Sequence, residues 1–175
     1  MKYVALLRGI NVGGNRKVEM NRLKTLFQDS GHKNVTTYIN SGNVLFESGD
    51  KKGAVLKNIE RILKKEFKFD IPILVKTQRA MKKIADAIPK DWKNDANQKS
   101  DVAYLFEEID SRKILQKLPF RKDYIDVRYV KGAIYWNIER KNYNKSQLNK
   151  IIGHELYQFM TVRNVNTARF LAENR

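Results

Sequence analysis

The chain has 175 residues, and its 35 lysines and arginines against 19 aspartates and glutamates give a formal net charge of +16. It contains no cysteine, which excludes disulfides, thiolate metal sites and a cysteine nucleophile, and its 42% hydrophobic content is that of an ordinary globular chain. Because no apolar run is long enough to span a bilayer and no cleavable leader precedes the first strand, we expect a cytoplasmic protein without membrane partners.

The first part of the chain predicts the element order β-α-β-β-α-β. Apolar residues recur at helical spacing in two stretches and form short β-rich runs in four others. Gly31 follows the first helix as its stop, and a polar turn over residues 40–43 suits a β-hairpin. The predicted elements are strands over 3–7, 35–39, 44–46 and 71–75, and helices over 20–30 and 54–67.

The rest of the chain predicts the same order after a connecting segment. Thr77 could cap a connecting helix that carries Met81 and Ile84, and residues 89–100 lack periodicity, as in a loop. The predicted elements that follow are a strand over 102–106, a short helix over 111–118, a hairpin over 124–130 and 133–138, a long amphipathic helix over 148–159, a short segment over 161–164 and a final helix through Leu171.

This repeated order is the split β-α-β arrangement of ferredoxin-like plaits. We therefore predict an α+β fold of two tandem ferredoxin-like plait subdomains packed together: residues 1–77, a connecting helix and loop over 78–100, and residues 101–175. The strands over 3–7 and 71–75 are apolar at both alternating sets of positions, so both faces of the sheet should be buried. We expect each subdomain to cover the other.

A glycine-containing loop lies between the first strand and the first helix, where phosphate-binding loops occur in many α/β folds. Residues 8–15 read Arg-Gly-Ile-Asn-Val-Gly-Gly-Asn, a glycine spacing that matches neither the dinucleotide fingerprint nor the P-loop. Two interpretations stay open: a tight turn whose glycines take positive φ, or anion binding by backbone amides and Arg8. The candidate ligand-binding residues here are Arg8, Gly9, Asn11, Gly13 and Gly14.

Two further polar segments are candidates for the same site. The turn over 40–43 is typical of a hairpin, yet it offers hydrogen-bond donors and acceptors from Asn40, Ser41, Gly42 and Asn43. The segment over 161–167 contributes Thr161, Arg163 and Asn164, where the alternative is that Asn164 or Asn166 caps the last helix.

Metal and cofactor chemistry find little support in the sequence. The two histidines, His32 and His154, stand far apart and lack ligand-spaced partners, so we predict no metal site and no cofactor. Glu107, Glu108 and Asp110 could hold Mg²⁺, but an acidic helix start that complements the helix dipole is the simpler interpretation.

Three functions stay open. The first is a binding or regulatory protein that holds an anionic or polar ligand in a cleft between the three polar loops. The second is charge-driven nucleic-acid binding, although the densest basic stretch, residues 51–68, is also typical of a solvated helix face. The third is an enzyme for a phosphorylated or acyl substrate, assisted by Arg8, Asn11, Ser41 and Arg163 without metal or thiol chemistry. A monomer is the default expectation.

Residues 4–14, 38–46 and 161–167 resemble the bacterial domain-of-unknown-function family 1697. The resemblance rests on the strand ending Leu-Leu-Arg-Gly-Ile-Asn-Val-Gly-Gly, on Tyr-Ile-Asn-Ser-Gly-Asn-Val and on Thr-Val-Arg-Asn. It implies two plait-like subdomains and assigns no catalytic or binding residue.

Overall fold

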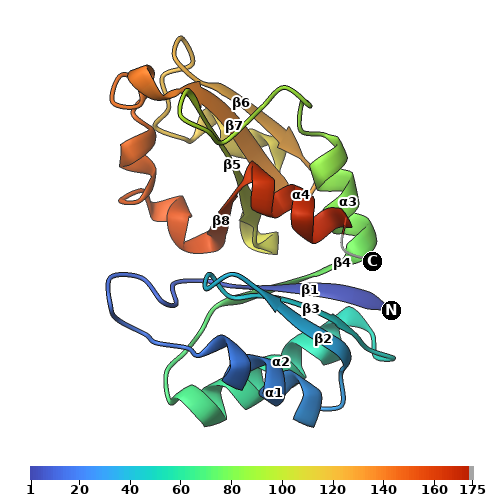
Figure 1. Ribbon diagram of the computed structural model, residues 1–175. Coiled ribbons are helices and arrows are strands. Elements are labelled where there is room, and N and C mark those ends of the chain that lie inside the picture. The colour runs from blue at the N-terminus through green and yellow to red at the C-terminus, as the bar shows by residue number, and fades with distance from the viewer. Residues whose placement is uncertain (174–175) are drawn as a thin grey trace. The chain divides into compact units, whose positions relative to one another are not determined.

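The computed structural model describes residues 1–173 and divides the chain into two compact units. The first unit comprises residues 1–78, and the second unit begins at residue 79. Each unit contains one four-stranded sheet whose neighbouring strands are all antiparallel (Figure 1). Four α-helices accompany the two sheets within the described residues. The predicted α+β class is therefore confirmed.

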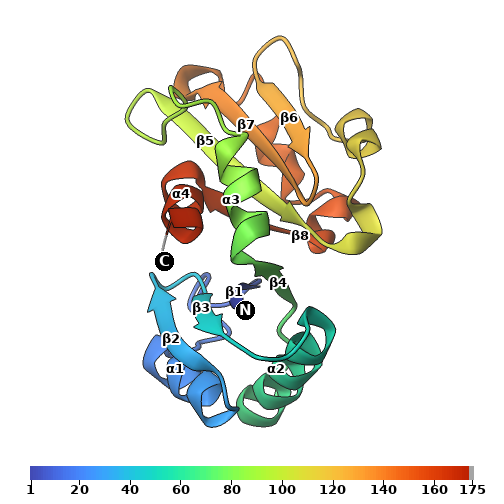
Figure 2. The same cartoon turned by 90° about the vertical axis from the view of Figure 1, so that its right-hand side faces the viewer.

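The first unit follows the order predicted for it. Its elements are β1 (Lys2–Leu7), α1 (Met20–Asp29), β2 (Lys33–Tyr38), β3 (Asn43–Glu47), α2 (Lys52–Phe67) and β4 (Ile73–Thr77). The strands lie in the order β2-β3-β1-β4, and both helices cover the same face of the sheet (Figures 1 and 2). The loop between β1 and α1 and the turn between β2 and β3 connect elements of this one unit.

The first unit's core forms between the helices and alternate residues of the strands. In β1 the residues Tyr3, Ala5 and Leu7 belong to this core, as the period of two in a strand requires. The helices contribute apolar residues spaced four apart, which lie on one helical face. These residues are Leu23 and Phe27 of α1, and Val55, Ile59 and Leu63 of α2.

Gly31 ends α1 as expected. Its φ of +91° places it in the left-handed region that glycine adopts without a side-chain clash. The amides of Gly31 and His32 then donate to the carbonyl oxygens of Gln28 and Phe27 at the end of the helix. The chain can therefore reverse directly into β2.

The second unit has the same strand connectivity with less helix. Its elements are α3 (Gln78–Asp86), β5 (Gln98–Leu105), β6 (Asp126–Val130), β7 (Ala133–Glu139), β8 (Met160–Asn164) and α4 (Val165–Glu173), and its strand order is β6-β7-β5-β8. The segment after α3 is hydrogen-bonded to α4, because the Arg169 side chain donates to the carbonyl oxygens of Pro89 and Trp92, each at 2.9 Å. Residues 79–97 thus belong to the second unit.

The predicted amphipathic helix over 148–159 is wrong. Two short 3₁₀ helices, η4 (Leu148–Ile151) and η5 (Glu155–Phe159), occupy this stretch. The break falls after Gly153, where His154 is extended (φ −80°, ψ 141°) and its Nδ1 accepts a hydrogen bond from the Leu156 amide. Glycine has poor helix propensity, and a side chain that caps a new turn competes with the continuous helix.

Other boundaries differ by a few residues. The helix expected over 111–118 is a 3₁₀ helix, η2 (Arg112–Gln116), with Ser111 as its N-cap. Thr77 ends β4 and directly precedes α3, which begins at Gln78. β5 begins at Gln98, inside the stretch expected to be a loop. Further 3₁₀ helices are η1 (Glu107–Ile109) and η3 (Arg140–Asn142). None of the helices described has the length and hydrophobicity needed to span a bilayer.

Candidate functional site

The loop after β1 folds back on itself as a small hairpin. Val12 and Asn15 form an isolated antiparallel bridge, and the Asn15 amide donates to the Val12 carbonyl oxygen at 3.2 Å. Between them Gly13 and Gly14 have φ values of +59° and +77°, the pattern of a two-residue turn with two left-handed positions. The glycines therefore make a tight turn, and a Cβ on either would meet no atom within 4 Å.

Asn11 ties this loop to its surroundings. Its Nδ2 donates to the carbonyl oxygens of Val18 and Asn40, each at 2.9 Å, and its Oδ1 accepts from the Val18 amide at 2.8 Å. Asn11 has a φ of +55°, a conformation that asparagine tolerates better than most residues. One side chain thus closes the loop at Val18 and joins it to the turn between β2 and β3. Two of the three predicted polar segments meet here.

The turn between β2 and β3 is held close to β1. The Leu7 amide donates to the Gly42 carbonyl oxygen at 2.8 Å. Gly42 has a φ of +77°, and a Cβ there would lie 2.8 Å from Leu7 Cβ and 2.7 Å from Ile10 Cδ1. Only glycine combines this backbone conformation with so close an approach. Gly42 is therefore a packing residue.

Asn43 also has a structural role. It is fully buried, and its Nδ2 donates to the Tyr38 carbonyl oxygen at 3.0 Å and to Ser41 Oγ at 2.9 Å. These bonds satisfy the amide inside the hairpin, as burial of a polar group requires. Of the four turn residues predicted as candidates, Asn40 is the one that reaches the depression described next.

A depression of about 650 Å³, which we call the loop depression, lies beside the hairpin loop. It is lined by Asn11, Gly14, Lys17, Val18, Glu19, Met20, Asn21 and Asn40. Its lining includes the start of α1, where Glu19 is extended and makes no side-chain cap. The first intrahelical bond of α1 runs from the Leu23 amide to the Glu19 carbonyl oxygen, so the amides that precede Leu23 have no partner within the helix.

Arg8 and Gly9 do not line the loop depression. The Arg8 amide donates to the Pro72 carbonyl oxygen at 2.9 Å, which fixes the end of β1 against the start of β4. Gly9 has a φ of +69°, a left-handed conformation that glycine adopts readily and that lets the chain change direction after β1.

The third predicted segment belongs to the second unit, where it forms β8 and the start of α4. Arg163 Nη1 donates to Thr161 Oγ1 and to the Val162 carbonyl oxygen, both at 2.9 Å. Burial lowers the pKa of Arg163 to about 10. Asn164 Oδ1 accepts from the Thr167 amide at 2.9 Å, the hydrogen bond of a helix cap. A shared cleft between this segment and the other two loops stays a prediction.

Sequence reasoning missed the residues that lead into α1. Lys17, Glu19 and Asn21 line the loop depression but fall outside the glycine-containing motif. The predicted start of the helix could have indicated these residues, because residues just before an amphipathic helix lie near its unpaired amides.

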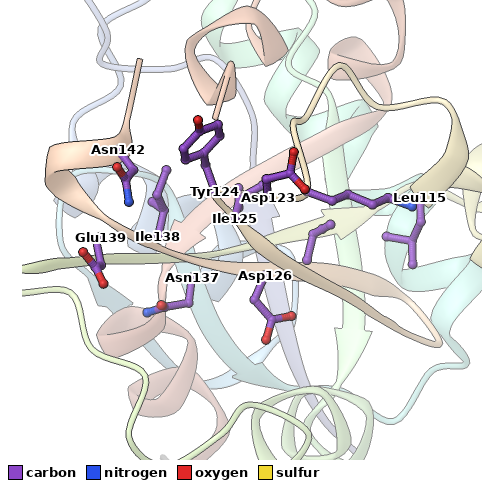
Figure 3. Close-up of a pocket in the computed structure, with 11 residues that line it drawn as sticks. Leu115, Asp123, Tyr124, Ile125, Asp126, Asn137, Ile138, Glu139 and Asn142 are labelled. Atoms are coloured by element: carbon purple, nitrogen blue, oxygen red, sulfur yellow. The ribbon is translucent and has the colours of Figure 1, made fainter. Parts of the chain in front are cut away.

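A second depression, of about 530 Å³, lies in the second unit around the start of β6 and the end of β7 (Figure 3). Three of its charged or polar lining side chains, those of Asp126, Asn137 and Glu139, already have partners. Both carboxylate oxygens of Asp126 accept from Arg128, Glu139 pairs with Lys141 at 2.6 Å, and Asn137 donates to Gln98 and Ser100. We treat the loop depression as the candidate site because Asn11, Gly14 and Asn40, which the sequence predicted as candidates, line it.

The histidines and the acidic cluster have structural surroundings. His32 is buried against the rings of Phe27 and Phe46, and burial lowers its pKa. Asp110 accepts from Tyr129 Oη and the Gly132 amide and pairs with Lys131, so it fixes the turn between β6 and β7. Over residues 1–173, no group of three or more histidine, aspartate or glutamate side chains is arranged to hold a metal ion.

Comparisons with known proteins agree with this fold. No curated protein matches the chain. The chain is similar to a solved structure described as the conserved bacterial protein SP0830 from Streptococcus pneumoniae, with 26% identity and a TM-score of 0.85 over 98% of this chain and 97% of that one. Residues 1–135 match the family described as "Protein of unknown function (DUF1697)". The resemblance seen in the sequence is confirmed, and the chain belongs to the DUF1697 family.

Proposed function

We propose that the first unit binds a small anionic ligand in the loop depression. The observation that carries the proposal is the Asn11 side chain, whose three hydrogen bonds hold the hairpin loop, the turn at Asn40 and the chain before α1 around one hollow. A depression of about 650 Å³ falls in the range of small-molecule sites.

The electrostatics of the depression favour an anion. The amides at the start of a helix carry a partial positive charge and point toward the space before the helix, which makes that end a ready site for phosphate or carboxylate groups. The first turn of α1 contains no acidic residue. The exposed Lys17 adds a full positive charge on the same lining.

Glu19 opposes this attraction. It is exposed at the N-cap of α1 and lines the same depression, so its carboxylate would repel a bound anion. The two charged lining residues therefore predict effects of opposite sign on anion affinity. This opposition separates specific binding from attraction to the net charge of the chain.

The test is a titration of the chain with inorganic phosphate at constant ionic strength, followed by nuclear magnetic resonance. Removing one charge at a helix end changes the interaction by about 0.3–1 kcal/mol, so Lys17→Gln should weaken binding about two- to fivefold and Glu19→Gln should tighten it by a similar factor. Lys33→Gln, at an exposed position of β2, is the matched control and should leave the affinity unchanged. Equal effects of Lys17→Gln and Lys33→Gln would contradict the proposal.

We also propose that both units are ferredoxin-like plaits and that the protein is cytoplasmic. The order β-α-β-β-α-β and the arrangement β2-β3-β1-β4 of the first unit support the first point, and the second unit repeats the arrangement as β6-β7-β5-β8. In the second unit, 3₁₀ helices stand where the plait would carry its helices.

A further inference from the structure

The outward side of α2 carries a line of positive charges. Lys57, Arg61 and Lys64 of α2 and Lys68, its C-cap residue, are all exposed and follow one another at spacings of four, three and four residues. Residues at these spacings lie on one side of a helix. We call this set the α2 stripe. It lies opposite Val55, Ile59 and Leu63, which α2 buries in the core of the first unit.

Nearby acidic groups leave most of this charge uncompensated. Glu66 is held by Arg22 of α1 through two hydrogen bonds of 2.6 and 2.8 Å, so its charge is neutralised between the two helices. Asp70 pairs with Lys64 at 3.1 Å, but both side chains are largely exposed, and such surface pairs exchange readily with other partners. Glu60 is exposed on the flank of the stripe.

We propose that the α2 stripe binds the phosphate backbone of a double-stranded nucleic acid, without sequence preference. From Lys57 to Phe67, its last residue, the helix rises by about 15 Å at about 1.5 Å per residue, and Lys68 follows directly. That length spans roughly five successive phosphates of one strand, at about 3.4 Å of duplex axis each. Three of the four cations are lysines, which neutralise phosphates as point charges and do not read base edges in the bidentate way of arginine.

The arrangement favours a nucleic acid over an anionic membrane. A helix that lies on a membrane inserts its apolar face, whereas the apolar face of α2 is already packed against the sheet. The large hydrophobic residues that are exposed among residues 1–173 are Met1, Val12, Ile39, Ile152 and Phe170, and none belongs to α2. The α2 stripe therefore offers charge without a membrane anchor.

The experiment measures the affinity of the full chain for a short fluorescent DNA duplex by anisotropy at several salt concentrations. The stripe variant is Lys57→Gln, Lys64→Gln and Lys68→Gln together. The matched control removes the same number of lysines from exposed positions of the second unit, as Lys113→Gln, Lys117→Gln and Lys150→Gln. The slope of log K against log salt is negative, and its magnitude decreases by about 0.9 for each phosphate that the protein no longer neutralises. The magnitude should therefore decrease by about 2–3 in the stripe variant and by less than 1 in the control.

Several results would overturn the proposal. Equal losses in the two triple variants would show that only the net charge matters. The proposal would also be wrong if the unaltered chain did not bind the DNA duplex at low salt, or if it bound phosphatidylserine vesicles and not DNA. If a triple variant does not fold, Lys64→Gln and Lys113→Gln make the same comparison, with an expected slope difference of about 1. Lys17→Gln, which tests the loop depression, should leave the DNA slope unchanged, so the two proposals can fail separately.

Discussion

Replacing Gly42 by alanine tests how tightly the turn between β2 and β3 packs against β1. The substitution forces an L-residue into the left-handed region at φ +77°, which costs about 1–2 kcal/mol. The new Cβ would also lie 2.8 Å from Leu7 Cβ and 2.7 Å from Ile10 Cδ1. Ile10 can rotate its terminal carbon away, but Leu7 Cβ is fixed by the strand, so overpacking should add about 1–3 kcal/mol.

Gly14→Ala is the matched control for this prediction. Gly14 has the same φ of +77°, yet a Cβ there meets nothing within 4 Å, so only the backbone cost of about 1–2 kcal/mol should appear. Urea unfolding followed by circular dichroism gives both free energies of unfolding. We expect Gly42→Ala to destabilise the chain by about 2–5 kcal/mol, clearly more than Gly14→Ala. Equal losses from the two variants would refute the close approach of the turn to Leu7.

Three further predictions concern single side chains. Asn11→Gly keeps the left-handed backbone conformation but removes three hydrogen bonds, so urea unfolding should show a loss of about 1–3 kcal/mol, and an unchanged midpoint would contradict the bridging role. Burial lowers the pKa of His32, so the neutral imidazole is favoured in the folded chain. The free energy of unfolding should therefore be unaffected by His32 above a pH of about 6.5 and should decrease as the pH falls below that value. His32→Phe should flatten this acid dependence of the urea midpoint, and an equally steep profile would refute the role of His32. Asp110→Ala should cost about 1–3 kcal/mol, because burial raises the pKa of Asp110 but hydrogen bonds from Lys131, the Gly132 amide and Tyr129 lower it by more. This loss should shrink as the pH falls below about 3.9, the ordinary pKa of aspartate, and a loss that stays constant with falling pH would show that the carboxylate charge is not the cause.

Hydrophobic periodicity predicted most of the fold because burial on one face determines where helices and strands form. The spacing of Val55, Ile59 and Leu63 matches the observed α2, and the β-rich runs match the strands of the first unit. The same rule failed over 148–159, where apolar residues recur at helical spacing but the helical conformation is interrupted after Gly153. Periodicity describes which side chains face the core, and two short 3₁₀ helices can satisfy the same pattern as one long helix.

The candidate site was only partly predictable. The motif over 8–15 indicated a polar loop, and its tight turn followed from two adjacent glycines. The hydrogen bond between Asn11 and Asn40 joins residues 29 positions apart, so it depends on the pairing of β1 with β3 and cannot be read from local spacing. Arg163 looked available for a ligand, and the sequence did not show that its Nη1 donates to Thr161 and Val162 within the same strand. For Asn164 the sequence left two alternatives open, and the hydrogen bond from the Thr167 amide confirms the helix cap.

The most direct test of the loop depression is the map of amide signals that shift when ¹⁵N-labelled protein is titrated with inorganic phosphate at constant ionic strength. Binding at the start of α1 predicts the largest shifts at Gly14, Met20 and Asn21, with a common saturation curve. Shifts spread over the exposed lysines of both units, or a linear response without saturation at those three amides, would contradict an anion site there.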